Sequence, residues 1–124
     1  MLNYILLYTG AGITIIWGIA HLFPTKSVVK GFGEISADNK NIITMEWIIE
    51  GIALIFIGAI VIGVTVIDKS AAVSTFIYFS SIFVLILLAV ISLFTGFRVN
   101  FLPFKLCPVL FTLSAILIFL GYYL

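Results

Sequence analysis

The sequence has very few charged residues, one cysteine and one histidine. Of its 124 residues, 9% are charged and 64% are hydrophobic, and the mean hydropathy is +1.37. Soluble domains carry about a quarter charged residues, and a soluble chain of this length could not bury so much apolar surface. We therefore expect an integral membrane protein with a single transmembrane domain over residues 1–124.

The scarce residue types exclude several kinds of chemistry. The lone Cys107 excludes an intramolecular disulfide and any multi-cysteine metal or redox motif. With His21 as the only histidine, a metal site has weak support, and we expect no metal and no cofactor. No Ser/His/Asp or Cys/His spacing favours nucleophilic catalysis, and Glu34 after Gly31 and Gly33 would repel a phosphate. The net charge is +1 and there is no run of basic residues, so the sequence lacks the basic surface with which proteins bind nucleic acid.

Four apolar segments predict four transmembrane helices in an all-α bundle. Each is long enough for the ~20 residues with which a helix crosses a bilayer. None shows the ~10-residue runs of alternating polarity that are typical of membrane β-strands. We expect helices at about residues 4–23, 42–67, 71–97 and 106–124. The first segment lacks a basic start and a cleavage signal, so we expect it to be retained.

The segment between the first two helices, residues 24–41, has a pattern of its own. Apolar residues recur there at near-helical spacing with charged residues between them: Val28, Val29, Phe32 and Ile35. This spacing predicts a short amphipathic interfacial helix at the lipid headgroups. An irregular loop with turns at Gly31 and Gly33 fits equally well. Ser36 or Asp38 is expected to cap the second transmembrane helix.

The positive charges predict how the chain is oriented. One side of the predicted bundle has only Lys69 and the amino terminus, and the other side has Lys26, Lys30, Lys40, Arg98 and Lys105. Positive residues are retained on the cytoplasmic side of a membrane. We therefore expect a multi-pass protein of the cell membrane, with loops 24–41 and 98–105 in the cytoplasm and both termini outside.

Two carboxyls near the start of the second transmembrane helix make the strongest candidate site. Glu46 and Glu50 lie four residues apart and so share a helix face, and ionisable groups in an apolar segment usually mark function. Trp17 and His21 share a face of the first helix in the same way. We expect one polar site on the cytoplasmic side, which also includes Trp47, Arg98 and Asn100.

Each candidate also has a plainer explanation. Glu46 lies near the headgroups, where it could be solvated or paired with Lys40 or Arg98. His21 could simply end the first helix with a hydrogen bond to a backbone carbonyl. The two tryptophans could belong to the aromatic belt that membrane proteins have at both interfaces.

Small residues form faces on the first two helices. In the first helix they are Gly10, Thr14 and Gly18, and in the second they are Gly51 with Gly58 and Ala59 with Gly63. Small residues allow the backbones of membrane helices to approach closely. We interpret these glycines as packing residues.

The set of one histidine, two glutamates and tryptophans resembles the acid/base pocket of sterol-isomerase-type membrane proteins, although spacing and helix assignment differ. Four helices with a membrane glutamate also resemble the small multidrug transporters. Their glutamate lies in the first helix, where this chain has no carboxylate. Both are likenesses of architecture, which implies little about function.

Three functions are compatible with the sequence. The first is a pocket that binds or transforms a lipid or other apolar small molecule, with Glu50 as the principal acid/base or cation partner. The second is a proton- or cation-coupled transporter or channel acting as a homodimer, which the one-sided placement of the charges disfavours. The third is a non-enzymatic subunit or scaffold that packs on another membrane protein. We rank the pocket first.

Overall fold

The computed structural model describes all residues 1–124, and its regular structure is entirely helical. The elements in chain order are α1 (Leu2–Leu22), α2 (Thr25–Gly31), α3 (Ala37–Asp68), α4 (Ala72–Phe94), the 3-10 helix η1 (Gly96–Arg98) and α5 (Leu102–Tyr123). Four of the helices, α1, α3, α4 and α5, are long and apolar enough to cross a membrane. The predicted all-α bundle of four transmembrane helices is therefore confirmed.

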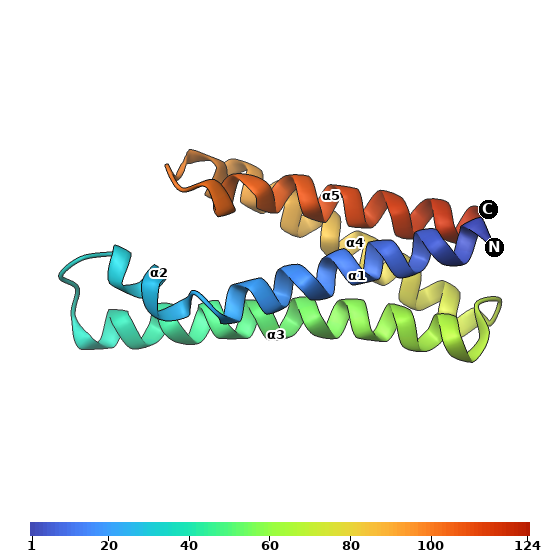
Figure 1. The fold of residues 1–124 in the computed structure, drawn as a ribbon, viewed down its shortest axis with the longest axis horizontal. Helices are drawn as coiled ribbons and strands as arrows, with labels where there is room; N and C mark the ends of the chain where they lie inside the picture. The colour runs from blue at the N-terminus through green and yellow to red at the C-terminus, as the bar shows by residue number, and fades with distance from the viewer.

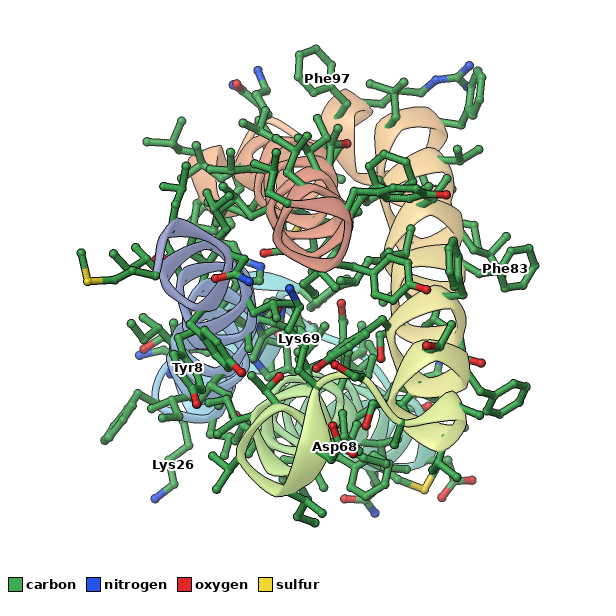
Figure 2. The ribbon with its side chains drawn as sticks, turned by 90° about the vertical axis from the view of Figure 1, so that its right-hand side faces the viewer. Tyr8, Lys26, Asp68, Lys69, Phe83 and Phe97 are labelled. Carbon is green, nitrogen blue, oxygen red and sulfur yellow. The ribbon has the colours of Figure 1, made fainter.

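The four long helices run side by side and alternate in direction (Figure 1). Both termini and the turn at residues 69–71 lie at one end, which we call the termini end, and α2 and η1 lie at the other, the site end. Helix α1 packs against α3 and α5, and α5 also packs against α4. Helix α4 leaves α3 at the turn and diverges from it toward the site end (Figures 1 and 2).

The core lies between the helices, while most of the outer apolar surface is open to lipid. Tyr78, Leu54 and Leu85 are among the largest side chains that are fully buried. Figure 2 views the bundle from the termini end and shows Phe83 and Phe97 pointing away from it. Helices satisfy their own backbone hydrogen bonds, so a bilayer can cover this surface without further protein.

Two helices begin earlier than hydropathy predicts. Helix α3 begins at Ala37 instead of residue 42, because the Ser36 hydroxyl accepts a hydrogen bond from the Asn39 N–H at 3.2 Å and caps the helix. Helix α5 begins at Leu102 instead of residue 106, with Pro103 in the first turn, where no intrahelical N–H bond is lost. The 32 residues of α3 extend about 48 Å, more than the roughly 30 Å of hydrocarbon. Its first turns therefore stand outside the hydrocarbon.

The segment after α1 combines the two structures that the sequence allowed. Helix α2 buries Val28 and Val29 and exposes Lys26 and Lys30, as expected of a short amphipathic helix. Gly33 then takes a positive φ of 74°, which turns the chain back toward α3. The amphipathic helix is present but ends at Gly31, so Phe32 and Ile35 of the predicted pattern lie outside it, and a glycine turn follows.

Replacing Ser36 with alanine will weaken the start of α3. The Asn39 N–H would lose its acceptor, and an N-cap of this kind contributes about 1 kcal/mol. We expect faster hydrogen exchange of the backbone amides of residues 37–40, with the amides beyond Gly51 unchanged. Ser27→Ala, at an exposed serine of α2, is the control. The capping role would be wrong if the two variants exchanged alike.

Candidate functional site

His21 lies in the last turn of α1 and is 4% exposed. Its Nδ1 atom is 2.8 Å from the backbone oxygen of Trp17, one turn earlier. A carbonyl oxygen can only accept, so Nδ1 must carry the hydrogen and donate it. The hydrogen bond to a backbone carbonyl, which the sequence offered as the plainer explanation, is thus present. It leaves the other ring nitrogen, Nε2, to face α3.

Glu50 of α3 faces that nitrogen. Its Oε1 atom lies 3.7 Å from His21 Nε2, in the only side-chain ion pair of the structure. Gly18 and Gly51 touch through their backbones and hold the two helices close at this level. Because Nδ1 already donates to the Trp17 carbonyl, Nε2 is the ring nitrogen that faces the carboxyl group.

A cavity of about 320 Å³ opens beside this pair, and we call it the His21–Glu50 cavity. Its other lining is mostly apolar, with Leu88, Phe104 and Phe111, and its hydroxyl groups come from Ser92 and Thr95. The two hydroxyl hydrogens go to backbone carbonyls of α4, so their lone pairs remain for a ligand. The lining suits a molecule with a small polar group and an apolar body.

The cavity is open at the side of the bundle. Ile91 of α4 and Val99 after η1 line it and are also exposed on the outer surface, at 51% and 44%. The Glu50 side chain, on α3, is 40% exposed. The opening therefore lies between α3 and α4, where Figure 1 shows the two helices diverging.

The pair lies at one end of a helix of membrane-spanning length. The 21 residues of α1 extend about 31 Å, which matches the roughly 30 Å of a bilayer's hydrocarbon. His21 is in the last turn of this helix, and the contact between Gly18 and Gly51 places Glu50 at the same level.

Aromatic rings from two helices contact the His21 ring. The ring centroid of Trp17 lies 5.4 Å away and that of Trp47 lies 4.9 Å away. Trp47 Nε1 also donates to the backbone oxygen of His21, which ties α3 to the end of α1. On its other side Trp47 meets Phe104 of α5, with 5.5 Å between the ring centroids. These contacts fix the orientation of the imidazole.

Of the seven predicted members, only His21 and Glu50 line the His21–Glu50 cavity, and the two tryptophans pack against the His21 ring without lining it. Glu46 lies one helical turn before Glu50, is exposed, and pairs with neither Lys40 nor Arg98. Arg98 and Asn100 are exposed as well, although Val99 between them lines the cavity. The structure thus gathers the two tryptophans and Glu50 around His21 and leaves these three outside.

Sequence reasoning named only two of the eleven residues that line the cavity, His21 and Glu50. Phe104 was assigned to a loop, whereas α5 already begins at Leu102. Pro103 at the first helical positions was the signal that could have located this start. Ser92 and Thr95 look like ordinary helical hydroxyls, and only the packing of α4 shows that they line a cavity.

The fold is that of a multi-pass membrane protein, and the site brings a histidine of α1 within 3.7 Å of a glutamate of α3. No group of three or more histidine, cysteine, aspartate or glutamate side chains comes close enough to hold a metal ion. Comparisons with models of protein families, with curated proteins and with solved structures found no match.

Proposed function

We propose that the protein binds a lipid or other apolar small molecule, whose polar head reaches His21 and Glu50 from the bilayer. The observation that supports this is the 3.7 Å pair, which lines a cavity of about 320 Å³ open between α3 and α4. Ligand cavities measure roughly 300–1,000 Å³, so this one holds a headgroup and the first part of a chain.

The chemistry of the pair selects the headgroup. A carboxylate at Glu50 accepts hydrogen bonds, and His21 is the only ionisable side chain that pairs with it. A headgroup with a hydroxyl or an amine can donate to the carboxylate, while the apolar lining contacts the attached hydrocarbon. A proton donor and a proton acceptor would then lie beside the bound group, which also suits proton transfer to the ligand.

We place the site end in the cytoplasm and the cavity mouth in the cytoplasmic leaflet of the cell membrane. The basic residues support this orientation, because only Lys69 lies at the termini end. Positive residues are retained on the cytoplasmic side of a membrane. A reporter fused to the carboxy terminus should then be active outside the cytoplasm.

Transport across the bilayer has less support than binding. Beyond the cavity, toward the termini end, the next buried side chains include Leu54 and Leu85. The polar contact near the far end, between Thr65 and the Tyr78 hydroxyl at 2.9 Å, is separated from His21 by this apolar layer. A polar head that enters the cavity therefore meets a closed core.

Glu50→Gln tests the proposal, because it keeps the size of the side chain and removes its charge. The probes are oleylamine and oleyl alcohol, which carry a donor, and methyl oleate, which carries none. We expect the two donors to raise the Tm of the purified protein and methyl oleate to have little effect. A hydrogen bond to a charged group contributes about 1.5–3 kcal/mol, so the variant should bind the donors about 10- to 100-fold more weakly.

Glu46→Gln is the matched control, since it makes the same change one turn away at an exposed position outside the cavity. It should respond to both donors as the unmodified protein does. An unchanged response in Glu50→Gln would end the assignment of Glu50. A loss in both variants would mean that the probes respond to the overall charge of α3 and not to the cavity.

A further inference from the structure

A second and larger cavity lies at the site end, between α2 and the start of α3. It has a volume of about 870 Å³. Of the six basic residues in the chain, three line this cavity: Lys26, Lys30 and Lys40. We call it the lysine groove. None of the residues of the His21–Glu50 cavity lines it.

The lysines of the groove lack carboxylate partners. The only ion pair of the structure is the one between His21 and Glu50, and the single acidic residue of the groove is Glu34. Three positive charges against one negative charge leave a surplus of two. Lys26 and Lys30 also lie four apart on α2, where like charges repel. A bound anion would relieve this repulsion.

The ammonium groups are the donors that remain for a ligand. Thr25 and Thr44 also line the groove, but both hydroxyl hydrogens go to backbone carbonyls, Thr25 to Leu22 at 2.9 Å and Thr44 to Lys40 at 2.7 Å. Lysine acts as a compact point charge and is a common ligand of phosphate. The groove therefore has the chemistry of a phosphate site.

The groove lies at the depth of the lipid phosphates. Helix α2 follows the end of α1 after only Phe23 and Pro24, and α1 ends at the edge of the hydrocarbon. Figure 1 shows α2 beside the first turns of α3, which stand outside that layer, and Figure 2 shows Lys26 extending away from the bundle. The headgroup region adds about 5–8 Å on each side of the hydrocarbon. A lipid phosphate in this region can reach the lysines.

We propose that the lysine groove binds the phosphate of an anionic membrane lipid. A phospholipid with a net negative charge fits better than a zwitterionic one, because the latter brings a positive group into a groove that already has a positive surplus. This site is independent of the His21–Glu50 cavity.

The test compares phosphatidylglycerol with phosphatidylcholine on the full chain in a neutral detergent, with the lipid-bound fraction measured by native mass spectrometry. We expect the unmodified protein to prefer phosphatidylglycerol. A lysine in the headgroup layer changes affinity for anionic lipid about fivefold. Replacing all three groove lysines with glutamine should therefore lower the affinity for phosphatidylglycerol on the order of a hundredfold. Lys105→Gln, at the same end but outside the groove, should change this affinity little.

A second pair of variants tests the sign of the effect. Glu34→Gln removes the only negative charge of the groove and should raise the affinity for phosphatidylglycerol about fivefold. Asp38→Asn removes the same charge at an exposed position of α3 that does not line the groove. It should leave the affinity almost unchanged. Equal gains in both variants would show a response to net charge and would overturn the site.

The remaining outcomes also decide the proposal. Equal binding of the two lipids, or binding of phosphatidylglycerol that survives the triple substitution, overturns it. If inorganic phosphate displaces phosphatidylglycerol at concentrations similar to those of the lipid, the groove binds soluble phosphate and the lipid is the wrong source. Glu50→Gln must leave phosphatidylglycerol binding intact. The proposal for the lysine groove and the proposal for the His21–Glu50 cavity can therefore be disproved independently of each other.

Discussion

Alanine at Gly58 will prevent α1 and α3 from packing as closely as they do. A Cβ atom at this position would lie 2.6 Å from the backbone oxygen of Ala11 and 2.5 Å from Cγ1 of Ile15. The Ile15 side chain can rotate away, but the carbonyl can move only if α1 itself moves. Helices in lipid associate through close packing and not through the hydrophobic effect. We expect a loss of about 1–3 kcal/mol of stability and a clearly lower Tm in detergent.

Gly63→Ala is the control on the same helix, because a Cβ atom there meets nothing within 4 Å. Alanine is favoured over glycine in a helix by about 1 kcal/mol, so this variant should be as stable as the unmodified protein or more so. The same contrast exists on α1, where Gly18 touches the backbone of Gly51 and Gly12 faces open space. Equal effects of alanine at Gly58 and Gly63 would contradict close packing as the role of Gly58.

The bundle was predictable because the sequence has two separate signals. Hydropathy locates the helices, and small residues mark the faces on which the helices pack. Long apolar runs identify the spans, and Gly51 and Gly58, seven residues apart, fall on one face that the structure packs against α1. Gly63 is five residues beyond Gly58, which places it about 140° around the helix. We expected Gly63 to be a packing residue, and this expectation is wrong, because no neighbouring helix lies close to it in the structure.

The candidate site was only partly predictable, because it depends on how helix ends meet. His21 and Glu50 could be recognised from their cost in an apolar segment, and the structure places them 3.7 Å apart. The direction of Arg98 and Asn100 depends instead on η1, a short turn that hydropathy does not describe. The cap of α3 was predictable, because Ser36 was one of the two residues expected there and its hydroxyl accepts from the Asn39 N–H.

Packing and the site are coupled in this fold. The backbone contact between Gly18 and Gly51 lies next to His21 and Glu50 in the sequence and sets the distance between their helices. A larger residue at either glycine would separate the imidazole from the carboxyl group. The residue that fixes the imidazole on its other side is Trp47.

Trp47→Ala will destabilise the bundle and also release the His21 ring. The indole packs at a tilt against the imidazole, contacts Phe104 of α5 and donates to the His21 backbone oxygen. Removing a packed tryptophan costs about 3–5 kcal/mol. We expect a lower Tm and also weaker binding of oleylamine, because the ring that faces Glu50 loses its support. Both are measured on the purified protein in the same detergent.

Two further variants separate packing from positioning. Trp47→Phe keeps a ring against His21 and loses only the donor, and a hydrogen bond between membrane helices contributes about 0.6 kcal/mol on average, so its stability and oleylamine affinity should fall little. Phe56→Ala removes an aromatic ring of α3 that is 62% exposed to lipid, and it should change neither quantity much. If Trp47→Ala were less stable but bound oleylamine as tightly as the unmodified protein, Trp47 would serve packing alone. Weaker binding at a temperature where the variant is still folded would identify it as a positioning residue for His21.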